Sequence, residues 1–525
     1  MGQPTRVSDF RSHRQGPSVR LLSMPSATHP GLLDADRCFD VMKARDGRFD
    51  GSFFVAVKTT GVYCRPSCPT PIQPKRSNVS FHRTAASAQR AGYRACKRCR
   101  PDASPGSPEW NVRGDLVGRA MRLIVDGVVD RNGVRGLASQ LAVSERHLHR
   151  LLTDQVGAGP LELARSQRAQ TARLLIETTS LSSSEIAFAA GFASIRQFHD
   201  TVRQVFAATP TELRANLSMS AKMARNRQVK GVELAGAVPI SIRLRARPPF
   251  DSLGLLSFLA ARAVSGVEQV NLDTRTYERT LRLPGGPGVV QASLGNDAVI
   301  ATFRLTNIAD LATASARIRR LFDLDTDTTV IDDHLCTDDR LAPSVRAQPG
   351  RRVPGAVDAH EIAVRAVLGQ QVSVAAARGT ARRLVSMFGE PMESGVPGLT
   401  HMFPSAAVLG ATDPSTIPIP KSRGRALVGL CAAMADGGID LTIGADRQRA
   451  RAQMMNAFGV GPWTADYVLI RALREPDGFL PTDLGVRHAA EKLGLPSSPS
   501  LITERAKRWA PWRSAALFHL WSVLS

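Results

Sequence analysis

The sequence AQMMNAFGVGPWTADYVLIRAL, residues 452–473, contains two apolar helical patterns separated by the glycine-rich turn Gly459-Val460-Gly461. Such a turn can expose backbone amides at the N-terminus of the second helix, where a phosphate group can bind. A Gly-Val-Gly turn between two helices is weak evidence when it is taken alone. Its interpretation therefore depends on the residues that follow it.

Two aromatic residues and one carboxylate follow the turn. Trp463 and Tyr467 lie in the second helical pattern, and Asp483 comes twenty residues after Trp463, in the segment GFLPTDLGVRH. An aromatic residue on an apolar helix belongs more often to a core than to a pocket, and Asp483 could simply cap a helix. Only the combined spacing of these residues points to a functional site.

The flanking sequence predicts two further segments. Residues 237–345 alternate like strands in VPISIRLRARPPF and AVIATFRL and have helical patterns in LLSFLAARAV and LATASARIRRLF, which is typical of a small α+β domain. From about residue 355 the pattern is helical, and AHEIAVRAVLGQQVSVAAARGTARRLVSMFG reads as one long apolar-striped stretch that ends at a glycine. We place the α+β domain at 236–350 and the helical domain at 355–525.

Together these segments resemble the AlkA-type 3-methyladenine DNA glycosylases of the helix-hairpin-helix superfamily. The resemblance implies that Asp483 is the catalytic carboxylate and that Trp463, Tyr467 and Trp521 form the base pocket. Breaking an N-glycosidic bond passes through an oxocarbenium-like transition state, whose positive charge a fixed carboxylate stabilises. A cationic alkylated base leaves readily, and aromatic walls can hold it by stacking and cation–π attraction.

The resemblance also assigns contacts with DNA. Gly459 and Gly461 would bind the backbone, and Gln371, within GQQVS, matches the position that fills the gap left by a flipped base. Ala457-Phe458 stands where the family usually has Leu-Pro. The sequence leaves open whether a monovalent cation occupies the hairpin, and one is kept as a candidate cofactor. Bifunctional relatives carry a lysine where this chain has Trp463, so we expect base excision without strand cleavage.

Four of the seven cysteines form two closely spaced pairs. Three residues separate Cys64 from Cys68, two separate Cys96 from Cys99, and 27 lie between the pairs. This spacing suits one tetrahedral site with four sulfur ligands, for which zinc is the default metal. A purely structural zinc remains an alternative. The other cysteines, which we expect to be buried or incidental, are Cys38, Cys336 and Cys431.

The surroundings of these cysteines are strongly basic, with ten Lys and Arg and no acidic residue between positions 51 and 101. A zinc-bound thiolate stays deprotonated and can attack a soft electrophile such as a methyl group. The segments FDGSFFVAVKTTGVYCRPSCPT and GYRACKRCRPD closely resemble the N-terminal domain of the bacterial Ada family. The resemblance implies that Cys64 irreversibly accepts a methyl group from a DNA methylphosphotriester. Methylation would make the site less negative and tighten its binding to DNA.

An internal repeat follows the cysteine region. GLASQLAVSERHLHRLL and SEIAFAAGFASIRQFHDTVRQVF share apolar positions separated by 49 or 50 residues, with Ser144 and Ser194 as the expected helix N-caps and Gly191 in the second turn. The duplication resembles the AraC-type double helix-turn-helix, in which two recognition helices enter the DNA major groove. A helical bundle with a solvated basic face is the alternative. The expected DNA-contacting residues are Arg146, His147, Arg150, Arg196, Gln197 and Arg203.

The length, net charge and cysteine content of the chain limit the possible domain number, partners and cellular compartment. The 525 residues suggest several domains, the net charge of +22 favours a nucleic-acid partner, and the absence of an apolar run long enough for a bilayer argues against a membrane protein. An odd number of mostly clustered cysteines fits a reducing cytoplasm. The first thirty residues lack a secretory signal, so a disordered tail is expected there.

We therefore predict a multidomain fold that is mainly α with α+β parts. The expected divisions are a tail at 1–30, an Ada-type domain at 31–106, a double helix-turn-helix at 112–216, a linker at 217–235 and the two glycosylase segments. The predicted functions are methyl transfer, activation of alkylation-response genes and excision of alkylated bases. The alternative is a transcription factor with a structural zinc and an inactive DNA clamp. Expected partners are double-stranded DNA and RNA polymerase, with the protein a cytoplasmic, nucleoid-associated monomer.

Overall fold

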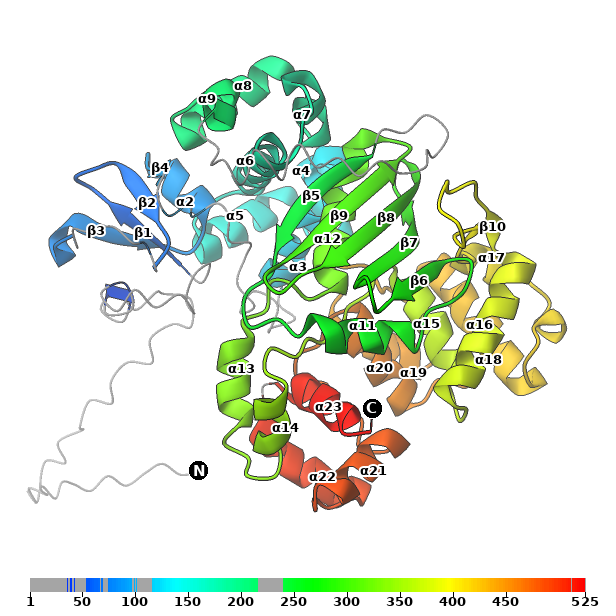
Figure 1. Cartoon of the computed structure of the whole chain (residues 1–525). Coiled ribbons are helices and arrows are strands. Elements are labelled where there is room, and N and C mark those ends of the chain that lie inside the picture. Colours follow the sequence, from blue (N-terminus) through cyan, green and yellow to red (C-terminus); the bar gives the residue numbers. More distant parts are fainter. Residues whose placement is uncertain are drawn as a thin grey trace, which may run out of the picture.

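The computed structural model describes residues 53–66, 68, 74–96, 99, 101, 116–215, 239–510 and 512–524, with a few positions between 35 and 42. The predicted tail at 1–30 and the predicted linker at 217–235 lie outside the described residues. In Figure 1 the described chain runs from a blue N-terminal unit, through cyan and teal helices, to red C-terminal helices at the bottom. None of the helices described is long and apolar enough to cross a membrane.

The N-terminal unit is a small sheet with one helix. Its order is β3-β1-β2-β4, with β1 antiparallel to β2 and β3 and β2 parallel to β4. The helix α2 begins after Thr84, whose side chain accepts a hydrogen bond from the Ser87 amide in a capping box. The bounds are β1 Phe54–Val57, β2 Val62–Cys64, β3 Val79–His82, α2 Ala85–Arg90 and β4 Arg94–Ala95.

Seven helices follow and contain the predicted repeat. The side chain of Ser144 accepts from the His147 amide and that of Ser194 from the Gln197 amide, so both expected N-caps are present. Gly191 has φ +85° in the turn before the second capped helix, a conformation that favours glycine. The bounds are α3 Leu116–Val125, α4 Val128–Gln140, α5 Glu145–Val156, α6 Pro160–Thr178, α7 Ser183–Ala189, α8 Ile195–Phe206 and α9 Pro210–Ala215.

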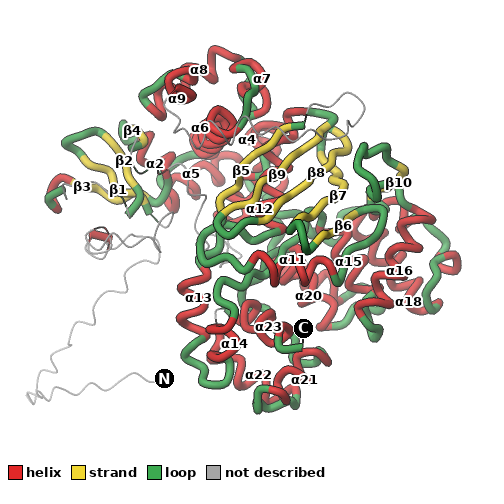
Figure 2. The backbone as a smooth tube through the Cα atoms, in the orientation of Figure 1, coloured by secondary structure: helices red, strands yellow, loops and turns green. Residues whose placement is uncertain are grey.

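Residues 240–321 form the predicted α+β unit. Its five strands make an antiparallel sheet in the order β5-β9-β8-β7-β6, and α12 packs on β7 and β9 (Figure 2). The helix expected over LLSFLAARAV starts earlier, because Asp251 caps it through the Gly254 amide. The bounds are β5 Ile240–Arg245, α11 Ser252–Ala260, β6 Glu268–Asn271, β7 Thr276–Leu283, β8 Gly286–Leu294, β9 Ala298–Leu305 and α12 Leu311–Leu321.

The remaining chain is mostly helical. Buried side chains of α13 and α14 share a hydrophobic core with those of α21, α22 and α23, although they are far apart in sequence. The principal bounds are α13 Thr328–Leu335, α14 Ala342–Ala347, α15 Ala359–Leu368, α16 Val374–Phe388, α17 Ala406–Gly410, α18 Lys421–Ala435, α19 Arg447–Met455, α20 Pro462–Ala472, α21 Leu484–Lys492, α22 Pro499–Ala506 and α23 Arg513–Ser522.

The stretch expected to be one long helix at 359–389 is in fact two. The helix α15 ends before Gly369, Gln371 adopts φ +55°, and Ser373 then caps α16 by accepting from the Ala376 amide. The apolar stripe continued across both helices, so periodicity alone did not reveal the break. A serine that satisfies the free amides of a new helix is the local reason for it.

The three units form one packed body. A single hydrophobic core includes Tyr63 and Ala88 from the N-terminal unit, Ile176 and Phe198 from the helices and Phe303 from the five-stranded sheet. The helix α6 contacts both α2 and β5, and α8 contacts β4. The central helices therefore pack against both the N-terminal unit and the five-stranded sheet.

Polar contacts also join α3 to the C-terminal half. Arg122 Nε donates to the carbonyl of Ile443 at 2.6 Å, and Arg119 Nε donates to that of Gly444, just before α19. The carboxylate of Asp126 lies 3.2 Å from the guanidinium of Arg320. The two arginine bonds attach α3 to the segment that leads into α19 and the glycine-rich hairpin, and the Asp126–Arg320 pair attaches the end of α3 to α12.

We expect the double variant Arg119→Ala/Arg122→Ala to loosen this attachment. Each bond from a charged donor contributes about 1.5–3 kcal/mol, and its loss leaves a carbonyl without its partner. Differential scanning calorimetry should then show a lower or split unfolding transition. Arg135→Ala removes an exposed arginine of α4 and serves as the matched control. Superimposable transitions for the double variant and the wild type would contradict the expectation.

Candidate active site and metal centre

The four predicted metal-binding cysteines come together at one end of the small sheet. Cys64 is the last residue of β2, and Cys96 follows β4, with its amide donating to the Tyr63 carbonyl at 2.9 Å. The amide of Cys68 donates to the Arg65 carbonyl at 3.1 Å, which closes the turn between the first two cysteines. All four sulfur atoms, including that of Cys99, lie within 4.8 Å of one another. The parallel pairing of β2 and β4 thus joins two pairs that are distant in sequence.

The chemistry of this donor set fits a divalent cation. Hydrogen bonds with Cys68, Cys96 and Cys99, together with burial, raise the pKa of Cys64, whereas hydrogen bonds with its three neighbours lower the pKa of Cys96. Four sulfurs this close therefore do not all ionise on their own. A zinc ion would accept four thiolates in this arrangement and reduce their mutual repulsion, leaving a net negative site.

Chelation of the metal should unfold the N-terminal unit selectively. The sulfur cluster and a small group of apolar side chains pack near β1 and β2, whereas Phe54, Ala56 and Tyr63 belong to the large core shared with the five-stranded sheet. Structural zinc sites supply folding free energy directly. Hydrogen exchange measured by mass spectrometry should therefore rise most across residues 53–96 and stay unchanged in residues 359–510, which lie outside that core. Unaltered exchange in both regions after complete metal removal would contradict this.

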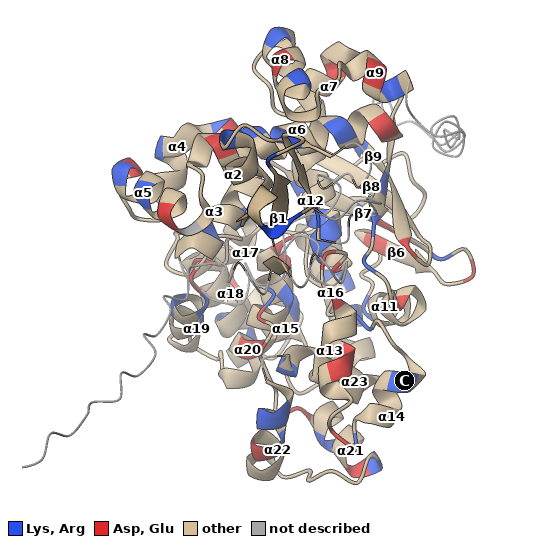
Figure 3. Cartoon of the chain, turned by 90° about the vertical axis from the view of Figure 1, so that its left-hand side faces the viewer, with Lys and Arg blue, Asp and Glu red and all other residues tan. Residues whose placement is uncertain are grey.

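The side chains in the repeat that are predicted to contact DNA are exposed to solvent. Arg146, His147 and Arg150 lie on the outward side of α5, and Arg196, Gln197 and Arg203 on that of α8. Figure 3 shows Lys and Arg on both helices. Each helix buries its opposite side, through Leu148 and Leu152 in α5 and through Phe198 and Val202 in α8. The glycosylase-like half leaves both outward surfaces uncovered, so both remain candidates for DNA contact.

The glycine-rich turn lies between α19 and α20, as expected. Gly459 has φ +75°, a backbone conformation that favours glycine. A Cβ at this position would also approach Ala426 Cβ to 2.5 Å, so there is no space for a larger residue. Gly461 is the N-cap of α20. Phe458 is 62% exposed at the tip. The amides at the start of α20 therefore lie beside an exposed apolar side chain on the surface.

A cavity of about 1180 Å³ opens beside this hairpin. It brings together every residue that the glycosylase resemblance assigned. These cavity-lining residues are Gln371, Gly459, Gly461, Trp463, Tyr467, Asp483 and Trp521. They come from the α15–α16 turn, the hairpin, α20, the N-terminus of α21 and α23.

Three aromatic rings form one wall of the cavity. Trp463 and Tyr467 are stacked with centroids 5.3 Å apart and an interplanar angle of 9°. Trp521 lies 6.4 Å from Tyr467, tilted by 51°. All three are only partly buried, although they contact the C-terminal hydrophobic core. The arrangement can accept a flat ring.

Asp483 is held by both tryptophans. The indole Nε1 of Trp463 donates to Oδ2 and that of Trp521 to Oδ1, each at 2.9 Å. Oδ1 also accepts from the Val486 amide at 2.9 Å, so Asp483 caps α21 as well. The carboxylate therefore serves both as a helix cap and as a fixed negative charge at the aromatic wall.

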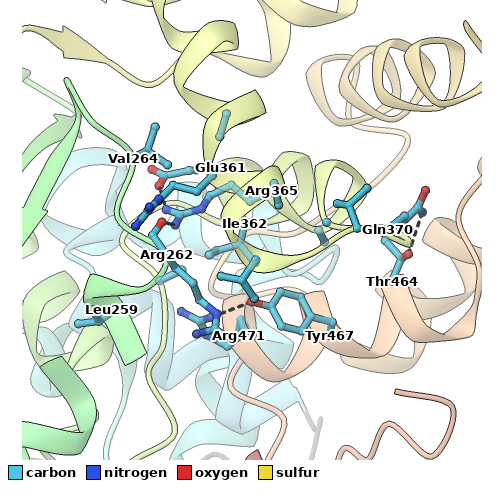
Figure 4. A pocket seen from close by; sticks show the side chains of 18 of the residues that line it. Leu259, Arg262, Val264, Glu361, Ile362, Arg365, Gln370, Thr464, Tyr467 and Arg471 are labelled. Atoms are coloured by element: carbon cyan, nitrogen blue, oxygen red, sulfur yellow. Dashed lines mark hydrogen bonds and ion pairs between the residues drawn. The ribbon is translucent and has the colours of Figure 1, made fainter. Parts of the chain in front are cut away.

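Two groups of cavity residues were missed by the sequence analysis. Gln370 Nε2 donates to the Gly459 carbonyl at 3.0 Å and to Thr464 Oγ1 at 2.9 Å, which ties the α15–α16 turn to the hairpin. Arg262 and Arg471 also line the cavity and extend toward the hydroxyl end of Tyr467 (Figure 4). The only sequence signal for these residues was their polar side chains. An amide in GQQVS and arginines within otherwise apolar helical segments are unusual.

The arginines affect Tyr467 directly. Arg471 Nη1 donates to the Tyr467 hydroxyl at 2.9 Å. Burial opposes ionisation of this phenol, but the positive charges of Arg471, Arg262 and Arg365 outweigh burial and lower the pKa of Tyr467. The part of the pocket around the Tyr467 hydroxyl is thus electropositive.

Comparison with known proteins follows the same division of the chain. The family models for the metal binding domain of Ada, a helix-turn-helix domain and the AlkA N-terminal domain match residues 37–102, 137–216 and 241–358. The first match and the sulfur cluster together confirm the prediction of one zinc site. The multidomain fold prediction is likewise confirmed.

Three curated relatives are similar to different lengths of the chain. The Mycobacterium tuberculosis protein called "Probable bifunctional transcriptional activator/DNA repair enzyme AlkA" is 52% identical over 94% of this chain and 97% of its own. Escherichia coli DNA-3-methyladenine glycosylase 2 is 36% identical, covering 53% of this chain and 95% of its own. The E. coli "Bifunctional transcriptional activator/DNA repair enzyme Ada" is 38% identical over 27% of this chain and 38% of its own. This chain therefore belongs to the family of bifunctional transcriptional activators and DNA repair enzymes in which an Ada-type half is joined to an AlkA-type half.

Proposed function

We propose that the C-terminal half hydrolyses the N-glycosidic bond of alkylated bases, of the 3-methyladenine and 7-methylguanine type, in double-stranded DNA. The observation that carries this proposal is the position of Asp483, which two indole N–H groups hold at the aromatic wall of the cavity. A fixed carboxylate beside an aromatic slot suits an oxocarbenium-like transition state and a flipped cationic base.

The chain's own residues account for each step. The amides of the hairpin hold a DNA phosphate, and Gln371 occupies the space that the flipped base leaves. The base stacks against the indole rings while Asp483 stabilises the positive charge that develops on the sugar. No lysine is among the described residues that line the cavity, so water rather than an amine completes the reaction and the strand stays intact. A monovalent cation at the hairpin remains a prediction.

The N-terminal half, on this proposal, repairs methylphosphotriesters. Sγ of Cys64 attacks the methyl carbon, a carbon–sulfur bond forms, and the carbon–oxygen bond to phosphate breaks, leaving an anionic phosphodiester. The zinc ligands Cys64, Cys68, Cys96 and Cys99 lie within 4.8 Å of one another. A bound zinc ion keeps them deprotonated at neutral pH. Cys64 then remains as a thioether, so each molecule reacts once.

Methylation of Cys64 would also regulate transcription. It removes one negative charge from a site in a basic segment, which weakens repulsion from DNA phosphates. The exposed residues of α5 and α8 would then bind promoter DNA in adjacent major-groove segments. We place the protein in the cytoplasm, on the nucleoid, as a monomer that activates RNA polymerase.

An inactive clamp with a structural zinc is the competing function. The experiment that separates the two measures zinc content and base release on the same preparation, with methylated duplex DNA as substrate. The proposal requires chromatographic detection of free methylated purines and strand breaks that form only after alkali treatment. Zinc-replete protein that binds this DNA and releases no base would establish the clamp instead.

A further inference from the structure

The tip of the glycine-rich hairpin presents an aromatic side chain to solvent. Phe458 is 62% exposed, whereas its neighbour Gly459 approaches Ala426 of α18 closely and lines the cavity. The carbonyl of Gly459 also accepts a hydrogen bond from Gln370 at 3.0 Å. Phe458 is not among the described residues that line the cavity. The tip is therefore anchored on two sides, and its aromatic ring lies outside the space that would receive a flipped base.

A cation accompanies this ring. The guanidinium carbon of Arg425, on α18, lies 5.3 Å from the centroid of Phe458. Arg425 is itself exposed, and a cation–π contact between two exposed side chains contributes little to folding. A single exposed apolar side chain is common on protein surfaces. An exposed aromatic ring beside an exposed arginine and the free amides of α20 is instead a combination that suits a ligand with both apolar and anionic parts.

The positive charge of Arg425 is not compensated within the protein. Lys421 precedes Arg425 by four residues, so the two cations are neighbours on one face of α18 and repel each other. Within the described part of the chain, neither side chain forms an ion pair with a carboxylate. The first turn of α18 also has no acidic residue, and the helix dipole disfavours cations there. A bound anion beside these residues would offset both unfavourable terms.

We propose that Phe458, Arg425 and Lys421 extend the DNA contact of the hairpin, with the Phe458 ring packing on a deoxyribose and the two cations binding phosphates that flank it. This inference rests on the glycosylase function proposed above, in which the hairpin amides hold a DNA phosphate. A deoxyribose adjoins every backbone phosphate, so the side chain next to the phosphate-binding turn meets a sugar of the same strand. The sugar offers the apolar surface, and the phosphates offer the anions.

The three side chains act on binding and not on the chemical step. Contacts with sugar and phosphate position the duplex but carry no sequence information. They strengthen binding equally for damaged and undamaged DNA and leave recognition of the lesion to the cavity. Since Phe458 stands where the family usually has proline, the aromatic contact is a feature in which this chain departs from that pattern.

Single-turnover base release from a short duplex with one 7-methylguanine tests the proposal. Phe458→Ala should raise the protein concentration that gives a half-maximal rate about fivefold and leave the maximal rate unchanged, because the contact lies outside the cavity. Arg425→Met should raise this concentration as well, and the slope of its logarithm against the logarithm of salt concentration should fall by about one, since one phosphate contact is lost. Lys421→Met should act in the same way, whereas Arg425→Lys should keep the wild-type slope.

Leu501→Ala and Arg346→Met are the matched controls. Leu501 is 59% exposed on α22, and Arg346 is exposed on α14. Both variants should keep the wild-type half-maximal concentration and salt slope. An unchanged half-maximal concentration in Phe458→Ala would overturn the proposal, and so would an unchanged salt slope in Arg425→Met. If the wild-type protein released no base, the proposed glycosylase function itself would fail before any variant is compared.

Discussion

Asp483→Asn is expected to reduce the rate of alkylated-base release by about a thousandfold, because the amide carries no charge to stabilise the oxocarbenium-like sugar. The variant should still fold. An asparagine oxygen can accept from the Val486 amide, which preserves the cap of α21. Release is measured by chromatography of free bases, and binding to undamaged duplex by fluorescence anisotropy.

Asp477→Asn provides the matched control for this variant. Asp477 is partly buried in the same helical region, where it pairs with Arg513 at 2.7 Å, but it does not line the cavity. Its replacement should change thermal stability more than base release. Wild-type rates of release in Asp483→Asn would remove this carboxylate from the mechanism, whereas loss of DNA binding would point to misfolding.

Cys64→Ala is expected to abolish methyl transfer completely, since the transferred methyl forms its new bond with this sulfur. After incubation with methylated DNA, mass spectrometry of the wild-type protein should show one added methyl on the peptide that contains Cys64. The variant should show none, while its base release continues because the cavity lies in the other half of the chain.

Cys336→Ala is the corresponding control, because Cys336 is a partly buried cysteine outside the sulfur cluster. It should still acquire the methyl group on Cys64. Stoichiometric methylation of Cys68, Cys96 or Cys99 in the wild-type protein would show that a different ligand is the acceptor. Zinc content should be measured on each variant, since the remaining three sulfurs bind the metal less tightly.

Local sequence patterns were sufficient for much of the architecture. Ser144 and Ser194 cap their helices as expected, since an N-cap depends only on the amides one turn ahead. The glycine-rich turn is likewise local, because Gly459 needs a positive φ. The roles that a family resemblance assigned to Asp483 and Cys64 remain predictions for the experiments above.

Other features depend on neighbours that the sequence does not reveal. The stripe over 359–389 looked continuous, but Gln371 and Ser373 interrupt it where Gln370 reaches the hairpin. The attachment of Arg122 to Ile443 joins residues more than three hundred positions apart. The periodic pattern of apolar residues along the sequence cannot predict a contact between such distant residues.

The sequence by itself indicated the zinc ligands and the repeated helices, because closely spaced cysteines and apolar periods are local patterns, whereas the residues of the cavity were implied by the family resemblance. Only the tertiary structure decided that the three units share one core and that the buried Arg471 lies beside Tyr467 in the cavity lining. The reason is physical: the surroundings of a buried charge depend on which distant segments pack around it, and that packing is a property of the whole fold.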